Sequence, residues 1–135
     1  MKHRIFYWIL GLSLLIVAVF AFAHEKTGWV APEEAKKMKN PIPITKVSIQ
    51  TGKEIYEKKC ALCHGVNGDG NGPASAGLNP KPTSFKEHHR MQVTDGEHFW
   101  KISRGRGPMP SFEKDLAVEE RWHVINYVNT FGKRK

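Results

Sequence analysis

The chain has 135 residues and a formal net charge of +8, from 21 lysines and arginines against 13 acidic residues. This length fits one domain with short accessory segments, because chains divide into several domains only at roughly twice this size. The positive excess can attract an acidic protein, nucleic acid or anionic lipid, but no nucleic-acid-binding motif is present, which excludes nucleic acid as a partner.

The first residues have the organisation of an export signal. A basic start at residues 2–4 precedes an apolar run over residues 5–22 and a short stretch of small residues. The run is longer than a usual cleavable signal and just long enough to span a bilayer. We therefore expect residues 1–23 to be a signal peptide or a membrane anchor formed by residues 5–23. In both cases the rest of the chain lies in the periplasm, because the positive residues stay inside.

Residues 24–47 are expected to form an extended leader. Pro32, Pro41 and Pro43 surround a charged segment, Glu33–Lys39, which predicts one short helical turn. Such a leader is a tether, a strap packed on the domain, or a docking element.

The remaining residues, 48–135, are expected to form one helical domain. A glycine- and proline-rich stretch at residues 65–82 is predicted to be a loop. No segment shows the alternation of a strand, so the fold class is all-α, with three or four short helices. So few short helices leave a thin core, and another group must fill the middle. The predicted helices run from Ser48 or Thr51 to about Lys59, from Asp95 to Ser103 after a Thr94–Glu97 capping box, and from about Ala117 to Phe131.

Cys60 and Cys63 are the only cysteines, and His64 follows them directly. This spacing serves redox disulfides, zinc sites and covalent haem attachment. A zinc site usually takes two such pairs, and a redox dithiol sits in a βαβ unit; neither feature is found in the sequence. In haem attachment the two thiols add across the haem vinyl groups and the adjacent histidine binds the iron. The motif therefore predicts one haem c, covalently bound through Cys60 and Cys63, with His64 as an iron ligand.

Met109 is predicted to be the second axial ligand of the iron. It lies between Pro108 and Pro110, which fix the backbone, in a segment whose glycines permit close approach to a haem face. A thioether is a soft donor that raises the reduction potential of haem iron relative to histidine. Met91 is the strongest rival to Met109 as this ligand. The weaker rivals are Met38, His88, His89, His98 and His123.

With these residues in place, the chain from about Ser48 to Phe131 resembles the class I c-type cytochromes, small single-haem electron carriers of the periplasm. The motif from Cys60 to His64 matches the attachment site, and Gly107-Pro108-Met109-Pro110 resembles the methionine loop. The resemblance implies the class I cytochrome c fold, in which short helices wrap one covalent haem. It extends to the crossing of the first and last helices, where the matching residues are Gly52, Tyr56, Val124 and Tyr127.

Further residues are expected to contact the haem. By the resemblance, the carbonyl of Pro73 accepts a hydrogen bond from the second ring nitrogen of His64. Trp100, Arg104 and Arg106 are candidates for contacts with the haem propionates, because an indole N–H and guanidinium groups donate to carboxylates.

The predicted function is the transfer of one electron between periplasmic or membrane redox partners, with no substrate transformed on this chain. A filled sixth iron position and a single attachment motif leave no site for catalysis. The alternative is a permanently bound haem c subunit of a larger respiratory or denitrifying oxidoreductase, which a retained anchor and the leader would favour. The basic surface predicts partners with acidic docking surfaces. Candidate docking residues are Lys58, Lys59, Lys101 and the tail Lys133–Lys135.

Overall fold

The computed structural model describes residues 28–132. This part of the chain contains helices and no strand, which confirms the all-α class. The predicted signal or anchor, residues 1–23, and the basic tail, residues 133–135, lie outside the described residues. The elements are α2 (Glu33–Lys37), α3 (Lys46–Lys59), α4 (Ala61–His64), the 3-10 turn η1 (Ser75–Gly77), α5 (Phe85–Arg90), α6 (Asp95–Arg104) and α7 (Val118–Val128).

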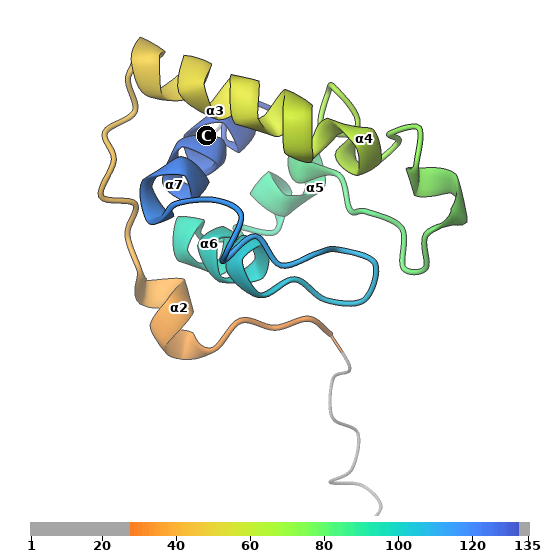
Figure 1. The fold of residues 1–135 in the computed structure, drawn as a ribbon. Helices are drawn as coiled ribbons and strands as arrows, with labels where there is room; N and C mark the ends of the chain where they lie inside the picture. The colour runs from red at the N-terminus through yellow and green to blue at the C-terminus, as the bar shows by residue number, and fades with distance from the viewer. Residues whose placement is uncertain (1–27, 133–135) are drawn as a thin grey trace, which may run out of the picture.

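Helix α7 lies between α3 and α6, and α4 continues from the end of α3 (Figure 1). None of the helices between residues 28 and 132 combines the length and the apolar character needed to cross a bilayer. The principal buried cluster lies between α3 and α7 and is formed by Tyr56, Ala61, Val124 and Val128. The described helices therefore share a small core close to the cysteine motif.

Helix α3 begins earlier than the sequence indicated. Its N-cap is Thr45, whose side chain accepts a hydrogen bond from the backbone N–H of Ser48 at 3.1 Å. Ser48 is therefore inside the helix and buried, and its hydroxyl lies 2.9 Å from Nδ1 of His123 on α7. The expected caps Ser48 and Thr51 were wrong because Ser48 faces a neighbouring helix, which the local sequence does not reveal.

The crossing of α3 and α7 requires a glycine. A Cβ atom placed on Gly52 would lie 2.0 Å from the carbonyl oxygen of His123 and 3.0 Å from Cβ of Tyr127. Tyr127 also packs against Tyr56, with ring centroids 5.3 Å apart. The predicted pairing of Gly52 with Tyr127 is thereby confirmed, and it brings the end of α3, which carries the cysteine motif, against α7.

We expect Gly52→Ala to destabilise the protein. The alanine would gain helix propensity, but its methyl group would collide with backbone that cannot move without separating two helices, at a cost of about 1 to 3 kcal/mol. The free energy of unfolding, measured by denaturant titration, checks this. Gly77→Ala is the matched control, because nothing lies within 4 Å of a Cβ at Gly77. Equal stability of the two variants would contradict the close crossing.

Local sequence patterns predicted helix α6 but not helix α5. The predicted N-cap of α6 is confirmed, since the Thr94 side chain accepts from the Glu97 N–H at 3.1 Å. Helix α5 was not predicted, because Phe85 is the only apolar residue in its six positions. Phe85 nevertheless packs its ring against Tyr56, with centroids 6.2 Å apart, so tertiary contact rather than amphipathic pattern accounts for this helix.

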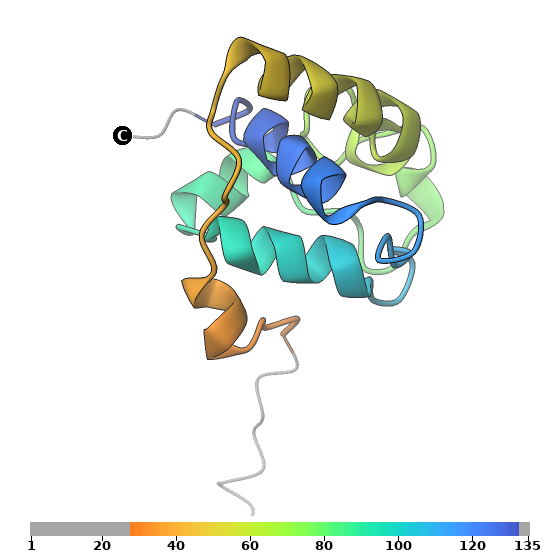
Figure 2. The same cartoon turned by 60° about the vertical axis from the view of Figure 1, so that its left-hand side comes forward.

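The part of the leader that the structure describes is a strap rather than a tether. Its short helix α2 buries Ala35 against α6, where a Cβ on Gly96 would lie 2.0 Å from the Ala35 carbonyl oxygen. Further along, Asn40 Nδ2 donates to Asn126 Oδ1 at 2.9 Å, and Asn126 Nδ2 donates to the Ile42 carbonyl at 3.2 Å. Figure 2 shows the strap running past α6 and α7 to the start of α3.

Candidate functional site

The cysteine motif forms one helical turn that continues α3. The backbone N–H of Cys60 donates to the Tyr56 carbonyl at 2.8 Å, and the N–H of His64 donates to the Cys60 carbonyl at 2.9 Å. Cys60 and Cys63 are free thiols, each half-buried. Two thiols and an imidazole are therefore presented from a single turn at the end of a packed helix.

The loop after the motif folds back and holds this turn in place. Gly65 adopts φ = 77°, and its carbonyl accepts a hydrogen bond from the buried Tyr56 hydroxyl at 2.7 Å. A Cβ on Gly72 would lie 2.3 Å from the Leu62 carbonyl oxygen, so only glycine allows the loop to approach this closely. Three loop amides donate to carbonyls of α4: Gly70 to His64 at 2.9 Å, Gly72 to Cys63 at 3.1 Å and Ala74 to Leu62 at 2.9 Å.

Burial keeps the first thiol and the imidazole uncharged. It raises the pKa of Cys60 to about 12, with a smaller contribution from neighbouring Cys63. A reactive redox dithiol needs the opposite shift, a lowered thiol pKa, so this environment disfavours the redox interpretation. Burial also lowers the pKa of His64 and thereby favours the neutral imidazole, which is the form that binds a metal.

His64 has a buried ring nitrogen with no hydrogen-bond partner. Its ring stacks on Phe85, with centroids 4.8 Å apart and an interplanar angle of 24°, and Nδ1 is the unpaired atom. Pro73 lies exposed on the loop, and the hydrogen bond from His64 to its carbonyl stays a prediction. An unsatisfied polar atom is costly in a protein interior, and it fits a site that holds a haem against this imidazole.

Met109 lies in a tight turn directly after α6. The N–H of Arg106 donates to the Met109 carbonyl at 2.9 Å, and the N–H of Met109 donates back at 3.1 Å. Gly105 and Gly107 flank this pair with φ of 63° and 57°. Met109 is half-buried, whereas the rival ligand Met91 is 60% exposed. Both Figure 1 and Figure 2 place this loop on the same side of the molecule as α4.

The three propionate candidates differ in their surroundings. Trp100 is half-buried and packs on Trp29 of the strap, with ring centroids 6.4 Å apart. Arg104 is exposed and lies 3.9 Å from a carboxylate oxygen of Glu113. Arg106 is exposed in the methionine turn. Trp100 therefore joins the strap to α6, and both arginines lie at the surface.

Two contacts of the site had no clear signal in the sequence. Phe85, which stacks on His64, follows a loop and belongs to a helix that was not predicted. The Tyr56 hydroxyl, which fixes Gly65, was expected only to pack at the helix crossing. The described residues contain no cluster of three or more histidine, cysteine or acidic side chains that could hold a metal ion.

Comparisons with known proteins place this arrangement in a family. Residues 47–128, more than half of the chain, match the family model described as cytochrome c oxidase, cbb3-type, subunit III. A cytochrome c-553-like protein of Synechocystis is 27% identical over 123 residues, spanning 90% of this chain and 96% of that protein. Cytochrome c6 of Euglena gracilis is 34% identical over 79 residues, spanning 58% of this chain and 87% of that protein.

Larger proteins contain a similar domain. The quinohemoprotein alcohol dehydrogenase ADH IIB of Pseudomonas putida is 29% identical over 119 residues, but the chain spans only 16% of its length. A solved chain of a reducing HAO-like protein complex of Kuenenia stuttgartiensis superposes with a TM-score of 0.59 at 27% identity, covering 84% of this chain and 54% of that one. These matches confirm the cytochrome c fold. The chain therefore belongs to the cbb3-type subunit III family of cytochrome c domains, and it is a single-haem electron carrier with covalently bound haem c.

Proposed function

We propose that this chain carries one electron on a haem c attached through Cys60 and Cys63, with His64 and Met109 as the axial ligands. The observation that carries the proposal is the turn at residues 60–64, where two free thiols and a neutral imidazole are fixed by the returning loop. The bound haem would supply a one-electron change between ferric and ferrous iron. His64 and Met109 together would occupy the iron and leave no position for a substrate.

Each protein group has a distinct role in this proposal. The thiols hold the cofactor permanently, and the buried imidazole of His64 provides a ligand without first losing a proton. The paired backbone hydrogen bonds between Arg106 and Met109 hold the tight turn that carries the thioether. A methionine ligand raises the reduction potential relative to a second histidine, which suits a carrier that must accept electrons readily.

Solvent extraction of the denatured protein tests the covalent attachment. After acid denaturation and extraction with acidified organic solvent, we expect the haem to stay with the polypeptide, because two thioether bonds hold it. A protein with non-covalent haem serves as the control and should lose its colour to the solvent. Haem that leaves the polypeptide would overturn the proposed roles of Cys60 and Cys63.

We also propose a periplasmic location. The support is the basic start and apolar run of residues 1–23, which would act as a cleaved signal or as an anchor in the inner membrane through residues 5–23. N-terminal sequencing of the native protein distinguishes the two, since cleavage after Ala23 yields a chain that begins at His24.

A permanent subunit of a larger respiratory or denitrifying oxidoreductase is the second candidate. It is favoured by the similarity to parts of longer chains, of which this domain spans 16% and 54% in the two cases compared. Purification of the native protein separates the candidates. A free monomer supports the shuttling carrier, whereas recovery only with partner chains supports the bound subunit.

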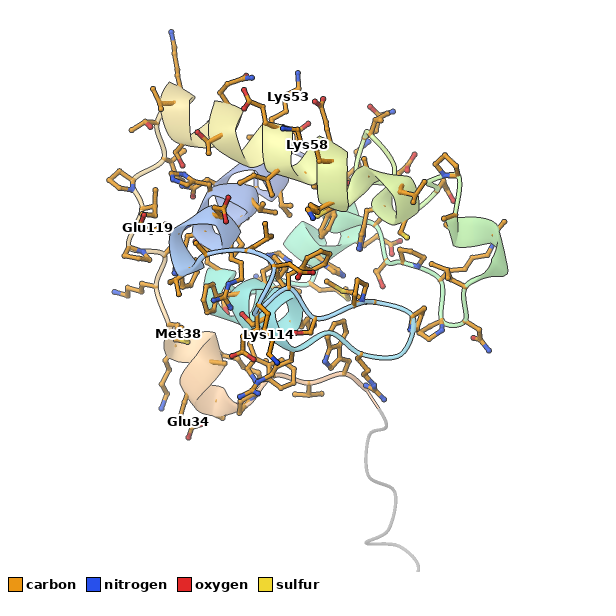
Figure 3. All side chains as sticks on the ribbon, viewed as in Figure 1. Glu34, Met38, Lys53, Lys58, Lys114 and Glu119 are labelled. Atoms are coloured by element: carbon orange, nitrogen blue, oxygen red, sulfur yellow. The ribbon has the colours of Figure 1, made fainter. Side chains whose placement is uncertain are left out.

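The basic surface is proposed to dock acidic redox partners. Lys58 and Lys59 are exposed in the last turn of α3, next to the cysteine motif, and Figure 3 shows Lys58 and Lys53 on this helix. Lys101 is less suited to docking, because its ammonium group lies 2.7 Å from the Glu97 carboxylate and its side chain is 16% exposed. Its charge is largely matched within the molecule.

Electron transfer with the partner should slow as salt rises. Attraction between exposed charges is screened over roughly 8 to 10 Å at physiological ionic strength, so the association rate falls when salt is added. Stopped-flow reduction over a salt series measures this. The double substitution Lys58→Gln and Lys59→Gln should flatten the dependence, and Lys114→Gln, remote in the sequence from the motif, is the control. If the reduction rate of the double variant fell as steeply with salt as that of the unmodified protein, these lysines would serve solubility and not docking.

A further inference from the structure

Arg121 is a buried cation with no anionic partner among the residues that the structure describes. It lies near the start of α7, is 5% exposed, and donates through Nη1 to the hydroxyl of Ser103. Its guanidinium carbon lies 4.7 Å from the centre of the Phe99 ring. Nε is buried and makes no hydrogen bond. Burying a charge in this way is unfavourable unless neighbouring polar groups compensate the loss of hydration.

The charge is placed at the C-terminal end of α6. Helix C-termini carry partial negative charge on their last carbonyls, which favours a nearby cation. Ser103 links the cation to this end, since its hydroxyl donates to the Phe99 carbonyl at 2.7 Å while accepting from Arg121. Arg121 therefore fixes the orientation of Ser103 in the last turn before the methionine loop.

Ser103 also holds the chain beyond Met109. Its carbonyl accepts a hydrogen bond from the hydroxyl of Ser111 at 2.5 Å, and Ser111 stands two residues after the methionine. The next residue, Phe112, donates its N–H to the Ile102 carbonyl at 3.0 Å. Both ties join the loop to the helix end that Arg121 stabilises.

We propose that Arg121 is a positioning residue for Met109: through Ser103 and Ser111 it keeps the methionine loop closed on α6 and α7. This rests on the proposed ligation by Met109. The paired hydrogen bonds between Arg106 and Met109 hold the turn itself, but the position of the turn relative to α6 depends on ties at its ends. A methionine ligand favours ferrous iron, so a loop that no longer holds Met109 in place would lower the reduction potential.

The test uses the haem-loaded protein with Arg121→Met, which keeps the volume and removes the charge and its hydrogen bonds. We expect a weaker sulfur-to-iron charge-transfer band in the ferric form, carbon monoxide binding to the ferrous form at least about fivefold faster, and a lower reduction potential. Arg121→Lys should restore the band and the potential in part, because its ammonium group can still donate to the Ser103 hydroxyl. Lys114→Met, which removes an exposed charge between α6 and α7, is the control and should match the unmodified protein (Figure 3).

The proposal would be overturned if Arg121→Met lowered only the unfolding midpoint and left the charge-transfer band, the carbon monoxide binding rate and the reduction potential unchanged. Arg121 would then be a residue of the core alone. If that variant does not accumulate, Ser111→Ala decides the question, because it removes one tie from an exposed position. A weakened band then supports the proposal and an unchanged band refutes it. Absence of the band from the unmodified protein would instead refute ligation by Met109.

Discussion

Met109→Ala should leave haem attached to the chain and open one face of the iron. The proposed thioether bonds and the proposed ligand His64 do not involve this side chain, so haem content per polypeptide should stay the same. Water would take the sixth position in the ferric protein, and carbon monoxide would bind the ferrous protein readily. The reduction potential should fall, because the thioether favours ferrous iron. Optical spectra, carbon monoxide titration and potentiometry measure these changes.

Met91→Ala is the matched control for this result. Met91 is 60% exposed after the end of α5, so its removal should alter neither the spectrum nor the potential. An open iron site in Met91→Ala together with an unchanged Met109→Ala would reverse the ligand assignment. Ready binding of carbon monoxide by the unmodified protein would show that the sixth position is open, and would revive the possibility of catalysis at the iron.

Replacing both Cys60 and Cys63 by alanine should remove most of the folded product. Within residues 28–132, the buried apolar side chains number ten, and three of them are alanines. Such a core is small for this many helices, so the covalent haem is expected to supply much of the buried apolar surface. The yield of soluble haem protein and its far-ultraviolet circular dichroism measure the loss.

Single cysteine substitutions and a neighbouring control sharpen this test. Cys60→Ala or Cys63→Ala alone should keep one thioether bond and an intermediate yield. Val66→Ala, at a 68% exposed position just after the motif, should express and load haem normally. A double variant that folds as stably as the unmodified chain would mean that the polypeptide core is sufficient by itself.

The sequence by itself determined the features that depend on local spacing. The turn from Cys60 to His64 continues α3 because no breaker separates them, and the breakers come directly afterwards at Gly65. The cap at Thr94 was predictable because a hydroxyl three residues before a free helix N–H has one obvious partner. The need for glycine at position 52 followed from the family resemblance. The structure agrees, because a Cβ at this position would lie 2.0 Å from the His123 carbonyl oxygen on α7.

Only the tertiary structure decided how distant segments meet. Ser48 was expected to cap a helix and instead faces His123, and the leader became a strap because Asn40 and Asn126 bond to each other across the fold. Phe85, from a helix that was not predicted, stacks on the His64 imidazole. These outcomes depend on contacts between residues far apart in the chain, and a local sequence pattern does not contain the energies of such contacts. The sequence therefore indicated the chemistry of the site, whereas tertiary packing decided which residues surround it.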